Sequence, residues 1–152
     1  MPAYRHILIP TDFSETAECA LHTAAELARQ NAADLHLLHI VAPQLYYTEM
    51  PEIMLPPMVD LTDQMKLAAE ERLQKAVGLL GKDIRIHHHV REAFTRSADA
   101  IVAAAEELAI ELIVIGSHGH SGLMHVLLGS TAERVVHEAT CDVLVVKHKN
   151  SA

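Results

Sequence analysis

Glycine and hydroxyl residues gather in one segment of the chain, between residues 116 and 131. The segment reads GSHGHSGLMHVLLGST and holds four of the six glycines of the chain. Glycine lets a ligand approach the backbone without a Cβ in the way. The segment ends in Gly129, Ser130 and Thr131, just before a stretch with helical periodicity, and the N–H groups at a helix start attract anions. The spacing therefore predicts a site for phosphate groups.

The same residues also have a purely structural interpretation. Gly116 and Gly119 could be turn glycines, and Ser130 with Glu133 has the S-x-x-E form of a capping box. Spacing alone leaves both interpretations open. Two familiar phosphate motifs are excluded, because the sequence has no G-x-x-x-x-G-K-[ST] and no glycine follows its first apolar run.

Charge restricts the partners and the chemistry of such a site. The 152 residues include 12 Lys and Arg against 20 Asp and Glu, a formal net charge of −8. An acidic chain without a basic cluster is not typical of a nucleic-acid-binding protein. Residues 116–131 contain no Lys or Arg, so we expect backbone N–H groups, Ser130 and Thr131 to be the phosphate donors.

The location of the protein is also an expectation from composition. No apolar run reaches the roughly 18 residues of a membrane span, and the start lacks a signal-peptide layout. Cys19 and Cys141 sit in apolar segments, which predicts two buried, reduced thiols and a cytoplasmic protein without membrane insertion.

The elements that must position the phosphate segment alternate along the chain. Apolar runs at 6–9, 35–41, 84–90, 112–115 and 143–146 predict five strands. Segments with helical periodicity separate them, with Ser14 placed to cap the first and Gly81 to end the second. This alternation predicts parallel βαβ units in one doubly wound α/β domain over residues 1–149, followed by a tail at 150–152.

One stretch, 42–60, does not fit the alternation. It carries Pro43, Pro51, Pro56 and Pro57, which exclude a regular helix or central strand. We expect a long loop rich in Pro and Met. It is either a crossover packed by its own side chains or a mobile flap or partner surface.

The twelve histidines do not form a recognisable metal-ligand spacing. His87, His88 and His89 are consecutive, so on a strand they point to alternating faces. We predict no dedicated metal site, although three histidines of the glycine segment could meet at a phosphate or a divalent ion: His118, His120 and His125. The remaining histidines of the strands and the C-terminal end are predicted to be structural: His6, His36, His39 and His148.

At this point the sequence resembles the nucleotide-binding members of the universal stress protein family. Their G-x2-G-x9-G-[ST] pattern is matched by Gly116, Gly119, Gly129 and Ser130, and the opening ILIPTDFSETA and closing CDVLVV also read like the family. The resemblance implies a fold like that of the adenine nucleotide alpha hydrolases. This is an open parallel five-stranded sheet of order 3-2-1-4-5, with helices on both faces. It further implies that ATP, or AMP or another adenine nucleotide, binds between the first and fourth strands.

The resemblance also assigns site residues by position. Pro10, Thr11 and Asp12 would line the adenosine end, with Ile40 against the base. The glycine segment would contact ribose and phosphates through Gly116, Ser117, His118, Gly119, Gly129, Ser130 and Thr131. For Asp12 we favour contact with the ligand over a role as general base or metal contact, and we assign no catalytic residue.

Three functions stay open at the level of sequence. The favoured one is a non-enzymatic, ATP-binding stress-response or signalling module, with Mg²⁺ arriving only with ATP. The alternatives are a slow ATPase or nucleotidyl-transfer enzyme, and a protein that regulates an unknown protein partner and binds nucleotide incidentally. The family often forms homodimers through the last strand, here between Val143 and Val146. Two departures from the family pattern are Ala93-Phe94 where a glycine is common, and Cys141-Asp142 in place of Cys-Pro.

Overall fold

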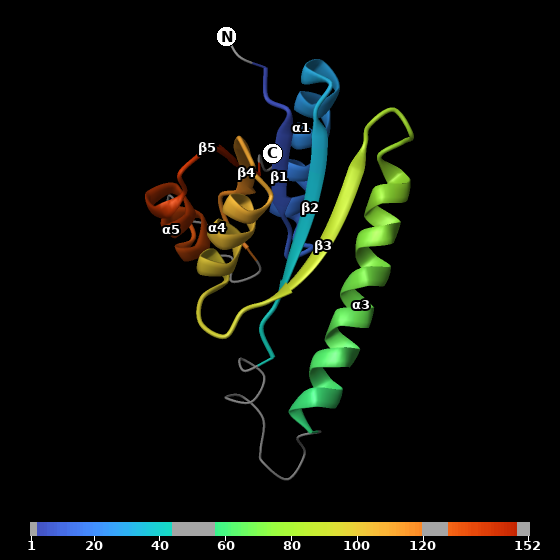
Figure 1. Cartoon of the computed structure of the whole chain (residues 1–152), viewed down its shortest axis with the longest axis vertical. Helices are drawn as coiled ribbons and strands as arrows, with labels where there is room; N and C mark the ends of the chain where they lie inside the picture. Colours follow the sequence, from blue (N-terminus) through green and yellow to red (C-terminus); the bar gives the residue numbers. More distant parts are fainter. Residues whose placement is uncertain (1–2, 44–56, 120–127, 149–152) are drawn as a thin grey trace.

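The computed structural model describes residues 3–43, 57–119 and 128–148, and its centre is one parallel sheet (Figure 1). The five strands lie in the order β3-β2-β1-β4-β5, and every neighbouring pair is parallel. The predicted fold class and the strand order implied by the resemblance are therefore confirmed. In chain order the elements are β1 His6–Pro10, α1 Glu15–Asn31, β2 Asp34–Val41, α3 Met58–Leu79, β3 Ile86–Glu92, α4 Ser97–Glu107, β4 Leu112–Gly116, α5 Ser130–Glu138 and β5 Asp142–Val146.

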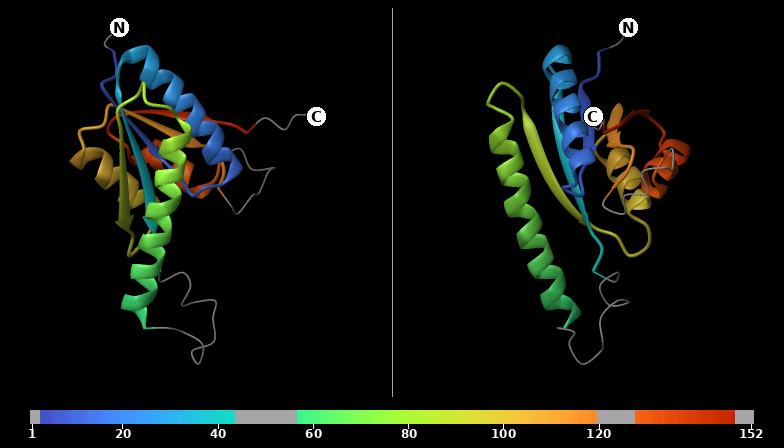
Figure 2. Two further views of the ribbon diagram at one scale, coloured as in Figure 1. Left: turned by 90° about the vertical axis from the view of Figure 1, so that its right-hand side faces the viewer. Right: turned by 180° about the vertical axis from the view of Figure 1, so that it is seen from behind.

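The helices cover the two faces of the sheet in pairs (Figure 2). Ile7 and Ile9 of β1 pack with α1 and with Leu73 of α3 on one face. Leu8, between them, packs with α4 and α5 on the other. Because successive side chains of a strand point to opposite faces, a strand buried on both sides has to be apolar throughout. All three residues are fully buried, which explains the unbroken apolar run at the start of the chain.

The strand order creates the position for a ligand. β1 lies between β2 and β4, with Ile7 in register with Leu35 on one side and Leu112 on the other. The chain leaves β1 toward one face and β4 toward the other, since α1 and α5 lie on opposite faces. At such a reversal the loops after the two strands separate and leave a crevice at their carboxyl ends.

The first helix begins where its sequence predicts. Ser14 is its N-cap, and the Ser14 hydroxyl accepts a hydrogen bond from the Ala17 N–H at 3.2 Å. The stripe of small residues that follows is buried at Ala17, Ala20, Ala24 and Ala28. Alanine at these positions lets the backbone of α1 approach the sheet closely, so α1 fixes the turn that precedes it.

Three details differ from the sequence prediction. Residues 58–60, predicted as loop, form the first turn of α3, with Pro57 at its N-cap. Proline is tolerated there because the first helical N–H groups have no partner within the helix. Cys19 and Cys141 are free thiols but only half-buried. The third strand starts at Ile86, two residues later than predicted, and Ile84 before it is buried in the core.

Part of the predicted loop at 42–60 cannot be compared, since 44–56 lies outside the described residues. Among the helices of the described residues, none combines the length and apolar character needed to cross a membrane.

Two leucines of α3 provide a test of this packing. Leu73 is fully buried against the sheet, whereas Leu67 is 67% exposed on the same helix. We expect Leu73→Ala to lower the free energy of unfolding by about 2–5 kcal/mol and Leu67→Ala to change it by less than about 0.5 kcal/mol. Urea unfolding followed by circular dichroism measures both, and equal losses would contradict the assigned face of α3.

Candidate functional site

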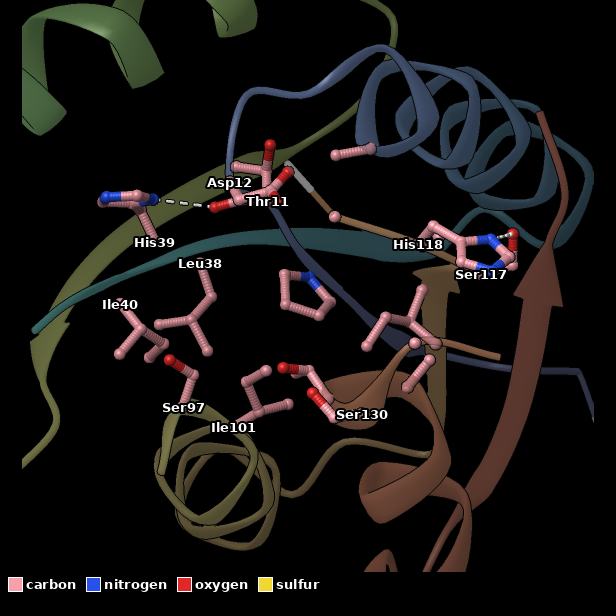
Figure 3. A pocket seen from close by; sticks show the side chains of 18 residues that line it. Thr11, Asp12, Leu38, His39, Ile40, Ser97, Ile101, Ser117, His118 and Ser130 are labelled. Atoms are coloured by element: carbon pink, nitrogen blue, oxygen red, sulfur yellow. Dashed lines mark hydrogen bonds between the residues drawn. The ribbon is translucent and has the colours of Figure 1, made fainter. Parts of the chain in front are cut away.

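A crevice of about 230 Å³ opens at the carboxyl ends of β1 and β4 (Figure 3). Every residue that the sequence assigned to the site lines this crevice. The structure thus brings together residues from the turn after β1, the end of β2 and both ends of the glycine segment: Pro10, Thr11, Asp12, Ile40, Gly116, Ser117, His118, Gly119, Gly129, Ser130 and Thr131. Their contact with a ligand stays a prediction.

The turn after β1 is fixed by its own polar groups. The Phe13 N–H donates to Thr11 Oγ1 at 3.0 Å, and the Ser14 N–H donates to Asp12 Oδ1 at 3.0 Å. Phe13 lies in the left-handed region at φ +63°. These local bonds are typical of turns built on Thr and Asp side chains, and they hold Thr11 and Asp12 at the mouth of the crevice.

The glycines of the segment after β4 leave room for other parts of the chain to lie close to the backbone. A Cβ on Gly119 would lie 2.5 Å from Asp12 Oδ2, and one on Gly116 would lie 2.9 Å from Thr16 Cγ2. Neither residue has a positive φ, and of the glycines in the described part of the chain only Gly81 does. Gly116 lies against the backbone and side chain of Thr16 in α1, and Gly119 lies against the side chain of Asp12, so both glycines occupy places where another part of the chain comes close.

The start of α5 differs from the predicted capping box. Gly129, not Ser130, is the N-cap, and no side chain caps the helix. The Gly129 N–H donates to Ser117 O at 2.7 Å, which joins the two ends of the glycine segment. Ser130 is the first helical residue, and its hydroxyl lines the crevice instead of capping the helix. The anion-attracting end of α5 thus faces the cavity.

Seven lining residues were missed or misjudged at the sequence level: Ala17, Leu38, His39, Ser97, Ile101, Ile115 and Ala132. Ser97 and Ile101 belong to α4, and Figure 3 shows them beside Ile40 across the cavity from Thr11 and Asp12. Helical periodicity marks Ile101 as a core position, but no local pattern indicates that α4 faces a cavity. Leu38 and Ile101 are buried apolar side chains, so this end of the crevice is an apolar slot.

His39 makes a structural hydrogen bond, as predicted, and it also lines the crevice. Its Nδ1–H donates to the carbonyl oxygen of Thr11 at 2.7 Å. Burial lowers the pKa of the His39 imidazole, so the ring is neutral at pH 7 with its proton on Nδ1. The Phe13 ring packs on His39 with centroids 4.7 Å apart, and the Arg72 guanidinium of α3 lies 4.1 Å from the Phe13 centroid. The turn after β1 is therefore held from β2 and from α3.

The backbone of Ile40 supplies a donor and an acceptor to the crevice. The Thr11 N–H donates to Leu38 O at 2.7 Å, while the Ala93 N–H donates to Val41 O on the β3 side. Because the peptide groups of a strand alternate between its two neighbours, those of Ile40 face the same side as those of Leu38. β1 ends at Pro10, so the Ile40 N–H and C=O are turned toward the cavity.

The charge of the lining is low. Among the described residues that line the cavity, Asp12 is the one carboxylate and no Lys or Arg is present. Ser117 is nearly fully buried, and its Oγ lies 3.0 Å from His118 Nδ1. In the described part of the chain, no group of three or more His, Cys, Asp or Glu side chains is placed to hold a metal ion. Gly122, His120 and His125 lie outside the described residues.

Comparison with known proteins gives the same family that the motifs indicated. The model of the Universal stress protein family matches residues 3–147. Universal stress protein A homolog 1 of Coxiella burnetii is 34% identical over 94% of this chain and 96% of its own length.

Solved structures agree. The structure of MJ0577, a universal stress protein of Methanocaldococcus jannaschii, has a TM-score of 0.80 at 31% identity and covers 99% of this chain and 100% of its own. A universal stress protein of Archaeoglobus fulgidus in complex with dAMP has a TM-score of 0.68 at 26% identity, over 96% of this chain and 100% of its own.

Two glycines test the role of close approach. Gly116→Ala places a Cβ against the backbone and side chain of Thr16, and we expect it to lower the free energy of unfolding by about 1–3 kcal/mol. Gly78→Ala, in α3, meets nothing within 4 Å and should raise it by about 0.5–1 kcal/mol, because alanine favours the helix. Chemical denaturation of both variants decides the matter, and a neutral Gly116→Ala would show that this contact is loose.

Proposed function

This chain belongs to the universal stress protein family, and from that premise we propose that it binds ATP, or AMP or another adenine nucleotide, in the crevice between β1 and β4. It would act there as a non-enzymatic stress-response or signalling module. The observation that carries the proposal is that the crevice is apolar at one end and attracts anions at the other. One end is an apolar slot between Ile40 and Ile101, and the other is the N-terminus of α5 beside Ser130 and Thr131. A nucleotide likewise has a base with apolar faces at one end and anionic phosphates at the other.

The slot end favours adenine over guanine. The Ile40 C=O can accept a hydrogen bond from the adenine amino group, and the Ile40 N–H can donate to the neighbouring ring nitrogen. Guanine presents the opposite pattern, an acceptor oxygen and a ring N–H. Leu38 and Ile101 are buried and offer apolar contact to the faces of a base.

The other end suits phosphate without a basic side chain. The N-terminal N–H groups of α5 and the hydroxyls of Ser130 and Thr131 are available there, and a helix N-terminus stabilises an anion. A Mg²⁺ ion arriving with ATP would be held by phosphate oxygens and water, since Mg²⁺ usually keeps several waters and the described residues offer no cluster of three ligands.

The side chains that line the crevice support nucleotide binding without rapid ATP hydrolysis. Phosphoryl transfer depends on positioned positive charge around the transferred group, and the described lining of the crevice contains no Lys or Arg. Asp12 Oδ1 is engaged by the Ser14 N–H, and Oδ2 lies under Gly119. The proposed role of Asp12 is to hold the turn and contact the ligand.

We propose in addition a homodimer through β5. This strand is an edge of the sheet, and Leu144 on it is 38% exposed. An unpaired edge strand is a ready template for a second copy. The free thiols of Cys19 and Cys141 suit the reducing cytoplasm, which is the proposed location.

Nucleotide binding is tested with the purified protein by isothermal titration calorimetry and thermal shift. We expect AMP and ATP to bind and raise the Tm, and GMP to bind at least about tenfold more weakly, because both contacts to Ile40 are lost. ATP and AMP that leave the Tm unchanged would overturn the proposal.

A glycine variant locates the binding. Gly119→Val pushes a side chain into the Asp12 carboxylate, and we expect the Kd for AMP to rise by about tenfold or more. Gly78→Ala is the matched control and should bind AMP as the unaltered chain does. If Gly119→Val also binds AMP normally, the nucleotide site lies elsewhere.

A further inference from the structure

Four histidines from three neighbouring strands lie together on the sheet face that carries Leu8 and Leu38. His6 and His36 share this face by alternation along β1 and β2. His87 is in register with His36, and His89 with Leu38, so both belong to the same face. The proposed nucleotide function uses none of the four.

Three of the four imidazoles form a continuous chain. His6 Nδ1 lies 3.4 Å from His36 Nε2, and His36 Nδ1 lies 3.1 Å from His89 Nε2. The His36 ring is also stacked on its two neighbours from β3, with centroids 4.8 Å from His87 and 5.3 Å from His89. His36 is only 7% exposed, so it links β1, β2 and β3 from inside the cluster.

The contacts between His6, His36 and His89 are compatible with three neutral imidazoles. A neutral imidazole has one donor and one acceptor nitrogen, so three neutral rings can satisfy both contacts. One added proton on His36 is still compatible, because His36 can then donate to both neighbours. A second proton, on His6 or His89, places two N–H groups against each other and breaks a contact. The unfolded chain has no such limit and takes up a proton on every imidazole.

The surrounding charges reinforce this preference at His36. Burial lowers the pKa of His36 to about 4, and the imidazoles of His87, His89 and His6 act in the same direction. Asp34 on β2 opposes the shift, but its oxygens already pair with His87 Nε2 at 3.0 Å and with Arg85 at 2.9 Å. Burial therefore dominates.

The same holds at His89, nearer the carboxyl end of β3. Burial lowers the pKa of His89, and the charges of Arg91, His87 and His88 on its own strand lower it further. Glu107 of α4 opposes them, but its carboxylate is paired with Arg91 at 3.1 Å. His36 and His89 thus contact one another, and the pKa of each imidazole is lowered.

Consecutive histidines of β3 have opposite surroundings. His87 faces the Asp34 carboxylate, and His88 faces Glu70 of α3 at 3.0 Å, so each of these rings lies against a negative charge. The His36–His89 contact, by contrast, joins two rings that tolerate one shared proton but not two, because a second proton places two N–H groups against each other. We propose that the His6–His36–His89 chain is an acid-sensing element that holds the carboxyl-terminal half of β3, residues 89–92, against β2 at neutral pH and loosens it on acidification.

The direction of the pH dependence follows from proton counting. His36 binds its proton in the unfolded chain near its ordinary pKa of 6.5 but in the folded protein only near 4. The contribution of His36 to stability is therefore complete above about pH 6.5 and is lost as the pH falls toward 4. At pH 5 this loss corresponds to a decrease in Tm of about 4–8 °C for a chain of this size.

The test compares His36→Gln with His22→Gln. Glutamine keeps a donor and an acceptor between His6 and His89 but cannot take up a proton, and the side chain of His22 is 69% exposed on α1. Between pH 7.5 and 5.0 we expect the ligand-free protein and His22→Gln to lose about 4–8 °C more in Tm than His36→Gln. An equal loss in all three proteins would overturn the proposal. No nucleotide is present, so the result is independent of the proposed function.

Two further measurements use the unaltered protein and do not depend on the folding of a variant. Titration of the His36 ring protons by NMR should give a midpoint far below 6.5, and a midpoint near 6.5 would overturn the proposal. Hydrogen exchange, corrected for its intrinsic pH dependence, should accelerate at pH 5.0 for amides 89–92 relative to those of β1. Uniform acceleration across β1, β2 and β3 would refute the local opening.

Discussion

The crevice depends on one close approach, in which the backbone at Gly119 passes over the carboxylate of Asp12. The two residues are more than 100 positions apart in the chain, and only the neighbouring positions of β1 and β4 bring them together. The approach places the turn after β1 directly against the segment after β4. The bond from Gly129 N–H to Ser117 O then brings the start of α5 to the same place. Strand order, loop contact and helix position are thus linked in a single arrangement.

Much of this arrangement could be predicted because its signals are local. Glycine spacing marks the segment after β4, Ser14 marks the start of α1, and unbroken apolar runs mark strands buried on both faces. The strand order itself came from the family resemblance, since alternation of elements predicts parallel units but not which strands are neighbours.

The parts that could not be predicted depend on long-range contact. Nothing in the residues around Ser97 or His39 indicates that they meet at one cavity, because α4 and β2 are joined there only by the fold. The capping box was a reasonable local prediction at Ser130, but the bond between Gly129 and Ser117 moved the helix start by one residue and left the hydroxyl facing the cavity. Long-range packing decided between two local options.

The length of α3 allows one helix to contact both β3 and the turn after β1. A helix of 22 residues is about 33 Å long, and Figure 1 shows it running beside β3 and past the end of the strand. Arg72, which lies over Phe13, sits about 20 Å from the N-terminal end of the helix. Within the same stretch of the helix, Glu70 faces His88 of β3 and Leu73 is buried in the core. The helix that covers β3 is therefore also in contact with the turn that lines the crevice.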